Sequence, residues 1–479
     1  MASFTEDIFF ATITELNAKL RAREFSAVEL THAFCDRLER IGPQYNALAL
    51  SLREPAVRKA KEVDGDLKRE RFRSPLQGIP FGAKDLLSVK GQITTWGAKP
   101  YAAQVFDYDA TVLTKLEKAG AILAAKLSMV ELAGGGGYRL AGASLFGPGL
   151  NPWDKSRWSG GSSSGSGSAV AAGLAPFALG SETSGSILTP SAYCGITGLR
   201  PTYGLVSRFG AMALSWTMDK VGPMCRSAED CGLVLQAIAG SDANDYASAG
   251  KSFYYAPQFS RELSAIKLGF APVDFEEWAD PVTREGFRAA IEVLRSMGLQ
   301  LVEVQIADLP YGAATSTVIS AEGSSIFEPL VQSGQVDQLA DKKQVAGLRA
   351  GLEIPAKDYL KAMRLRTLVR QEFRRVLTDV DAILAPCRYS VASKVADPLD
   401  RNTTGESAAP KLAGMRALIP GGNLAGLPAL SLPCGFAGNL PIAIQLVSRP
   451  FTENLILSIG KEFQKRTDWH RKRPPVPSL

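Results

Sequence analysis

The chain has 479 residues, 46% of them apolar and 21% charged, which is the balance of an ordinary globular protein and excludes a disordered one. Its 54 basic and 48 acidic residues leave a net charge of only +6, and no basic strip interleaved with aromatic residues occurs, so nucleic-acid binding is not indicated. Residues 1–15 lack the pattern of a signal peptide and no apolar run reaches about 18 residues, so we expect a cytoplasmic protein without a membrane span.

Residues 1–70 are predicted to form a helical segment. Apolar residues recur at helical spacing between residues 7 and 40, and Ser26 is placed to cap the second of two helices, which ends before Pro43. Residues 53–73 are strongly charged and predict an exposed helix with its loop. We expect this segment to be scaffold.

The next stretch, residues 76–89, is short and apolar but holds Lys84 and Asp85 in its middle. It predicts a strand that crosses the core, where a lysine is costly unless it is paired or neutral. The alternative is a lysine at a strand end whose ammonium reaches solvent. Residues 110–125 then predict a helix followed by a buried strand, and this β-α-β order favours an α/β sheet.

Serine and glycine dominate residues 158–190. Residues 159–168 alone have the composition of a flexible linker. However, residues 169–179 form an apolar run of small residues typical of a packed helix or strand, and a second glycine-serine turn follows at residues 180–186. Two such turns that bracket a core element can meet at one point in space, so the stretch is a candidate nucleophile site.

The second half of the chain continues the alternation of helices and strands. We expect helices at 227–239, 281–297, 358–380 and 453–463, and strands at 267–271, 299–304, 382–385, 427–433 and 441–447. Residues 305–355 look irregular and glycine-rich, and residues 387–412 look like a polar loop. Without repeats or a clear linker, we predict one α/β domain over 1–479, with a mixed central β-sheet flanked by α-helices on both faces and a variable substrate-side region at 305–412.

The residue inventory excludes several chemistries. The two histidines, His32 and His470, lie in a helix and a basic tail, so a Ser-His-Asp triad and a catalytic zinc are not indicated. The six cysteines form no Cys-x-x-Cys pair, and the glycine-rich turns match neither a P-loop nor a dinucleotide fingerprint. We therefore expect no metal and no cofactor. A serine nucleophile would then need a neutral lysine as its base, and Lys84 is the candidate.

The glycine-containing blocks at residues 78–85, 160–169, 180–187 and 194–201 resemble those of the amidase signature family, in the family's order. Residues 219–223 and 423–428 are similar to further family blocks. This resemblance implies a Ser-cisSer-Lys triad in which Ser186 is the nucleophile, Ser162 the bridging serine after a cis peptide bond, and Lys84 the base. It also implies an oxyanion hole built from the backbone N–H groups of Thr183, Ser184, Gly185 and Ser186.

Some positions depart from the family pattern. Glu182 and Leu188 stand where the family commonly has an aspartate and an arginine, and Ser184 and Ser164 each replace a glycine. In glutamine-using members an aspartate precedes the Asn-Leu-Ala-Gly block by seven residues, and Arg416 is the corresponding residue here. These changes affect the pocket but leave the three triad positions intact.

The resemblance implies a hydrolase that cleaves amide C–N bonds, and possible further substrates are esters and carbamates or urethanes. Two alternatives remain: the glutamine-hydrolysing subunit of a tRNA-dependent amidotransferase, and a non-catalytic binding scaffold. For the first reading we expect a small-molecule amide as the only partner, no nucleic acid, no membrane, and a monomer or homodimer. Substrate choice is expected to lie in residues 127–150, 305–355 and 387–412.

Overall fold

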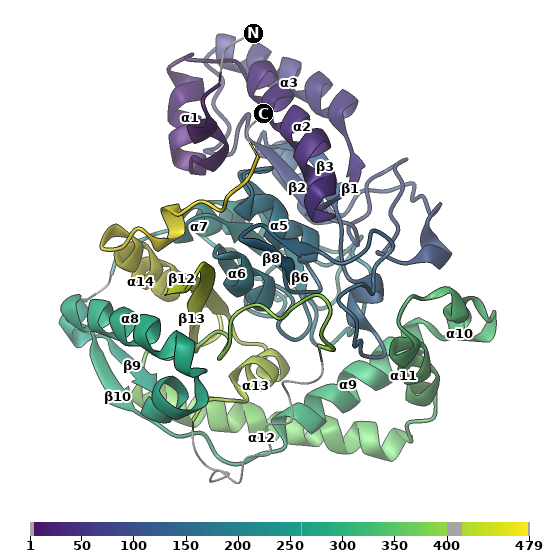
Figure 1. The fold of residues 1–479 in the computed structure, drawn as a ribbon, viewed down its shortest axis with the longest axis vertical. Coiled ribbons are helices and arrows are strands. Elements are labelled where there is room, and N and C mark those ends of the chain that lie inside the picture. The colour runs from purple at the N-terminus through teal and green to yellow at the C-terminus, as the bar shows by residue number, and fades with distance from the viewer. Residues whose placement is uncertain (1–3, 260, 400–413, 478–479) are drawn as a thin grey trace.

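A mixed sheet of eleven strands runs through the middle of the molecule (Figure 1). The computed structural model describes residues 4–259, 261–399 and 414–477. The strand order is β1-β3-β2-β6-β8-β7-β12-β13-β11-β9-β10. The strands are β1 (Leu48–Ser51), β2 (Pro80–Lys84), β3 (Ile122–Leu127), β6 (Phe177–Glu182), β7 (Thr197–Arg200), β8 (Lys220–Cys225), β9 (Lys267–Phe270), β10 (Gln300–Glu303), β11 (Ala382–Pro386), β12 (Ala429–Ala437) and β13 (Leu440–Ser448).

Helices cover both faces of this sheet. They are α1 (Ile13–Arg21), α2 (Ala27–Ile41), α3 (Arg53–Lys68), α4 (Thr111–Lys118), α5 (Ser164–Ala171), α6 (Leu188–Cys194), α7 (Ala228–Ile238), α8 (Arg284–Ser296), α9 (Tyr311–Ile326), α10 (Glu328–Gln332), α11 (Lys342–Leu352), α12 (Ala356–Asp379), α13 (Leu418–Ala425) and α14 (Glu453–Lys465). The predicted α/β fold, one domain with a mixed central sheet between helices, is confirmed. A short hairpin of β4 (Leu150–Asn151) and β5 (Asp154–Trp158) stands apart from the sheet.

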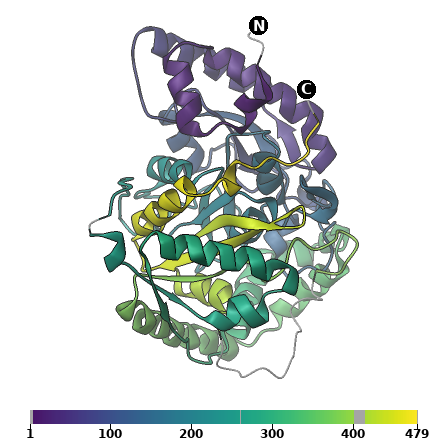
Figure 2. The same cartoon turned by 60° about the vertical axis from the view of Figure 1, so that its left-hand side comes forward.

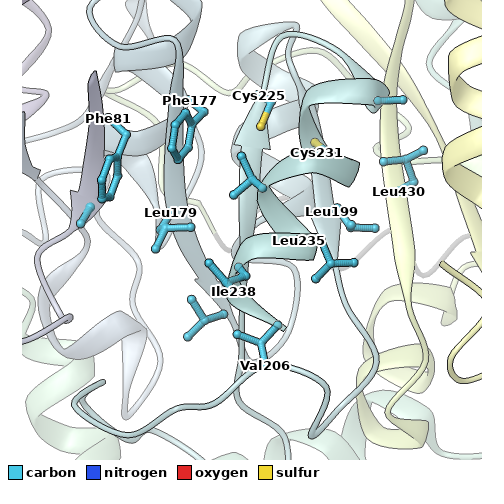
Figure 3. Packing of buried hydrophobic residues seen from close by; sticks show 14 of the residues in the cluster. Phe81, Phe177, Leu179, Leu199, Val206, Cys225, Cys231, Leu235, Ile238 and Leu430 are labelled. Carbon is cyan, nitrogen blue, oxygen red and sulfur yellow. The ribbon is translucent and has the colours of Figure 1, made fainter. Parts of the chain in front are cut away.

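Side chains alternate between two cores along the central strands. Phe177 and Leu179 of β6 face α7, where they pack with Leu235 and Ile238 (Figure 3). Ala178, between them in sequence, belongs to the opposite core together with residues of α5. This alternation, with every second residue on one face, is the pattern of a strand buried on both sides.

Two parallel strands bring the chemistry-bearing residues to one edge of the sheet. β2 pairs with β6 in parallel, and Lys84 and Glu182 are the last residues of these strands. β8 is antiparallel to β6 and begins at Lys220, so its first residue lies at the same edge. The edge that holds Lys84 therefore also holds the turn after β6, as expected from the sequence.

The N-terminal and C-terminal segments lie beside each other at one end of the molecule in both views (Figure 2). Ser26 caps α2 through a capping box with Glu29, as predicted. Arg473 near the C-terminus pairs with Asp7 at 2.7 Å. Within the described ranges, no helix is both long and apolar enough to cross a membrane.

The prediction of an irregular segment at 305–355 is wrong, because α9, α10 and α11 fill most of it. Its glycines permit close helix contacts instead of breaking helices. A Cβ atom on Gly351 of α11 would lie 2.0 Å from the Oγ of Ser324 in α9, and one on Gly347 would lie 1.8 Å from the carbonyl oxygen of Gly136. The polar loop predicted at 387–412 is irregular as far as residue 399, and its residues 400–413 lie outside the described ranges.

Candidate active site

Lys84 is fully buried at the end of β2. Its Nζ atom lies 2.7 Å from the Oγ of Ser162 and 2.9 Å from the Oγ of Ser181. Burial lowers the pKa of this amine to about 7, although the carboxylates of Asp219 and Glu182 act in the opposite direction. The alternative in which the ammonium of Lys84 reaches solvent is therefore wrong. The neighbouring Asp85 does not neutralise Lys84, because it pairs with the buried Lys126 at 2.8 Å.

Ser162 lies in the turn before α5, and the Gly161–Ser162 peptide bond is cis, as the resemblance implied. Its side chain is buried. The next residue, Ser163, ties this turn to β6: its hydroxyl donates to the carbonyl of Ser181 at 3.2 Å and accepts from the N–H of Ser181 at 3.3 Å. The N–H of Ser163 also donates to the carbonyl of Ser186 at 3.4 Å. The two glycine-serine turns therefore meet in space.

Ser186 lies in the second turn, between β6 and α6, with 9% of its surface exposed. Within the described part of the chain, no hydrogen bond joins the hydroxyls of Ser162 and Ser186. The backbone N–H groups of residues 183–186 likewise have no acceptor among the described residues. Gly185 adopts a left-handed φ of +88°. The turn thus presents four free donors beside a serine hydroxyl, which is the arrangement needed to bind a developing oxyanion.

Glu182, the last residue of β6, holds this turn in place. One carboxylate oxygen accepts from the N–H groups of Ile187 and Leu188 at 2.9 and 3.0 Å. The other accepts from Arg200 at 2.9 Å and from the side-chain amide of Asn423 at 2.7 Å. Burial opposes ionisation of Glu182, but these partners, led by Arg200, outweigh burial and lower the pKa of its carboxyl. Glu182 was noted in the sequence only as a departure, and its bracing role was missed.

Asp219 braces the same turn from the other side. Its carboxylate accepts from the hydroxyl of Thr183 at 2.6 Å and from the N–H groups of Leu214 and Ser215. The Nζ of the adjacent Lys220 is buried without a hydrogen-bond partner among the described residues, and burial, with Arg200 nearby, lowers the pKa of this amine well below its usual value. Asp219 lay in a block similar to the family's, which was the only sequence signal for it.

A cavity of about 420 Å³ opens beside these residues. Ser181, Thr183, Asp219 and Lys220 line its polar side, and aromatic rings including those of Trp96, Tyr108 and Trp216 line the rest. Among the residues described, no group of three or more histidine, cysteine, aspartate or glutamate side chains could hold a metal ion. All six cysteines are buried and unpaired.

The chain is similar to known proteins over almost its whole length. The sequence profile of the amidase family matches residues 29–457. The A subunit of glutamyl-tRNA(Gln) amidotransferase from Carboxydothermus hydrogenoformans is 34% identical over 98% of this chain and 100% of its own length. The native peptide amidase of Stenotrophomonas maltophilia superposes with a TM-score of 0.81 at 28% identity, over 98% of each chain. A protein from a vestigial complex linked to the origin of an s-triazine catabolic enzyme superposes with a TM-score of 0.85 at 27% identity, over 95% and 98% of the chains.

One expectation from the sequence is overturned by these findings. We expected a monomer or homodimer that acts on a small-molecule amide without nucleic acid. The relative from Carboxydothermus hydrogenoformans is by name one subunit of an enzyme of glutamyl-tRNA. Composition and net charge could not reveal this, because one chain of a complex can take part in a tRNA-dependent reaction without a basic strip of its own.

Proposed function

This chain belongs to the amidase signature family of C–N hydrolases, and we propose that its reaction uses Ser186 as nucleophile, Ser162 as proton relay and Lys84 as base. The observation that carries the proposal is the 2.7 Å contact between Lys84 and Ser162 in a fully buried setting. An amine with a pKa of about 7 is substantially neutral at neutral pH, so it can accept a proton.

In the proposed reaction, neutral Lys84 takes the proton of Ser162 while Ser162 takes the proton of Ser186. The Oγ of Ser186 then attacks the amide carbonyl, and the oxyanion is held by the free N–H groups of residues 183–186. The proton returns along the same relay to the leaving nitrogen, the C–N bond breaks, and an acyl-enzyme remains on Ser186. Water, activated by the same relay, releases the carboxylic acid and regenerates the serine.

For the substrate, we propose the side-chain amide of glutamine, hydrolysed as one step of a tRNA-dependent amidotransferase. The similarity to the A subunit of such an enzyme over 98% of the chain supports this reading. It implies at least one partner protein, to which the ammonia product is passed on. Ammonia release from glutamine should then rise when the chain is purified together with its partner and glutamyl-tRNA.

A second candidate is a carboxamide other than glutamine. Arg416 favours it, since an arginine stands where glutamine-using members have an aspartate. The guanidinium of Arg416 lies over the ring of Trp278, 2.9 Å from its centroid, so this position offers no carboxylate to an α-ammonium group. Hydrolysis of glutamine and of amides without the ammonium, measured side by side, separates the two candidates.

The first experiment tests the nucleophile. We expect Ser186→Ala to abolish ammonia release and labelling by a fluorophosphonate, because the relay and oxyanion hole alone lack a group that bonds to the substrate carbon. Ser252→Ala, an exposed serine far along the chain, is the matched control and should behave like wild type. Labelling that persists in Ser186→Ala would contradict the assignment, and a wild-type protein that is neither labelled nor active on any amide would support the scaffold alternative.

A further inference from the structure

Arg388 lies beside the helix that follows the proposed nucleophile. It comes directly after β11 and Cys387, and the segment it begins, yellow-green in Figure 1, runs past α6. The thiol of Cys387 donates to the carbonyl of Leu188, the first residue of α6, at 3.5 Å. The guanidinium carbon of Arg388 lies 5.8 Å from the ring centroid of Tyr193, near the end of α6. Arg388 is therefore held against α6, within two turns of Ser186.

Aromatic rings connect Arg388 to the turn that carries Ser162. A Cβ atom on Gly161 would lie 3.2 Å from the hydroxyl oxygen of Tyr138 and 2.7 Å from the ring of Trp158. The ring centroids of Tyr138 and Tyr193 lie 6.1 and 6.5 Å from that of Trp158. The hydroxyl of Tyr138 therefore reaches the Gly161–Ser162 peptide bond, and Arg388 shares this aromatic wall.

No acidic side chain neutralises Arg388 within the described ranges, where neither an ion pair nor a hydrogen bond to a carboxylate involves it. The strongest influences on its charge are the phenol of Tyr193, which raises the pKa of the guanidinium, and burial, which opposes it. A guanidinium remains charged in proteins and presents a planar fork of donors that matches a carboxylate. A partly buried cation without a counter-ion is unfavourable, so an anion from outside would complete this site.

The other arginines near the site are already engaged. Arg200 pairs with Glu182 at 2.9 Å in the core, and Arg416 stacks on Trp278. Position 188, where the family commonly has an arginine, is occupied by Leu188. Arg388 is thus the cation on this side of the nucleophile turn whose charge the described residues leave uncompensated.

We propose that Arg388 binds a carboxylate of the substrate, so that the enzyme selects amides of dicarboxylic acids over neutral amides. This inference rests on the proposed amide hydrolysis. The hydroxyls of Tyr138 and Tyr193 are placed to donate to the same carboxylate. Arg388 is a specificity-determining residue: it anchors the far end of the acyl part while the amide carbonyl sits at the turn of residues 183–186.

The test compares three substrates of matched length: glutaramate, which carries a carboxylate, butyramide, which is neutral, and glutamine, which adds an ammonium. Arg388→Gln should lower kcat/KM for glutaramate by about 10- to 100-fold, mainly through KM, because a charge-assisted hydrogen bond is lost. Its kcat/KM for butyramide should stay within about twofold of wild type, and Arg388→Lys should recover part of the loss. Arg364→Gln, an exposed arginine on α12, is the matched control.

Equal losses on glutaramate and butyramide would overturn the inference and assign Arg388 a structural role, as would unchanged kinetics on both. These results leave amide hydrolysis itself intact. If wild-type protein hydrolyses none of the three amides, the proposed function fails, and binding decides the inference separately. Calorimetry should then detect glutaramate binding to Ser186→Ala and a loss of that binding in Ser186→Ala/Arg388→Gln, and equal binding by both proteins would contradict the inference.

Discussion

At the scale of single residues, the chemistry of Lys84 follows from what surrounds its Nζ atom. Two serine hydroxyls contact the amine, whereas its nearest carboxylates, Asp219 and Glu182, act on it only through space. A directly paired lysine would keep its proton, because an adjacent negative charge stabilises the ammonium. Asp85 would have been such a partner, but Lys126 engages it. The pairing of Asp85 with Lys126 therefore leaves Lys84 free to act as a base.

The pKa of Lys84 predicts the pH dependence of the reaction. The base must be neutral, so kcat/KM should rise as pH increases through about 7 and reach a plateau above it. Lys84→Arg should lose about 10²- to 10⁴-fold in kcat/KM and lose this limb, since a guanidinium does not deprotonate in this range. Rates measured between about pH 5.5 and 9 on one amide provide the check. A wild-type profile that is flat through neutral pH would show that another group is the base.

At the scale of elements, the turn between β6 and α6 depends on contacts from distant strands. Glu182 receives Arg200 from β7 and Asn423 from α13, and both partners are buried. The sequence predicted the turn itself, because small residues and glycines mark it locally. It did not predict the bracing pair, because that pair forms only after β6, β8, β7 and β12 take neighbouring places in the sheet.

The same reason separates the other successes and failures of the sequence. The strand of Lys84, the caps at Ser26 and Ser227, and the helix α12 have local signals and are found close to where they were expected. Glycines at 347 and 351 were misread as loop formers, since only the packing of α9 against α11 explains them. The aromatic wall around Arg388 joins residues 138, 158, 193 and 388, which no local pattern connects.

The bracing contact predicts a large effect of Glu182→Gln. The substitution removes the charge that balances Arg200, and breaking a buried ion pair from one side costs about 3–5 kcal/mol. We expect the free energy of unfolding in urea to fall by about that amount, with a lower kcat because the 183–186 donors lose their anchor. Glu117→Gln, which disrupts an exposed pair with Lys59, should cost less than about 1 kcal/mol. Similar costs for the two variants would contradict the bracing role.

At the scale of the whole molecule, the C-terminal tail returns across the sheet to the N-terminal helices (Figure 2). Arg226, directly after β8, donates to the carbonyls of His470 and Lys472 at 3.3 and 3.2 Å. Arg473 then pairs with Asp7. The first and last described segments are therefore held together through a buried arginine, and the stability of this closure depends on the charge state of the groups inside it.

His470 makes this closure sensitive to acid. Its imidazole is buried, and the Nδ1 atom has no hydrogen-bond partner among the described residues. Burial, with Arg471 and Arg226 nearby, lowers the pKa of His470 to about 4, against 6.5 for an ordinary histidine. Between these values the unfolded chain binds the proton more readily than the folded chain. The contribution is therefore fully present above about pH 6.5 and is lost as pH falls toward 4.

We expect wild-type protein to lose about 2–3 kcal/mol more stability than His470→Gln between pH 7 and about pH 4.5. Urea unfolding of both proteins at the two pH values measures this double difference. Asp230, whose pKa burial raises to about 7, and the surface carboxylates titrate in both proteins, so their effects cancel in the comparison. His32→Gln in α2, whose side chain is partly exposed, is the control and should follow wild type. If His470→Gln lost as much stability in acid as wild type, the tail would not be the acid-sensitive part of the fold.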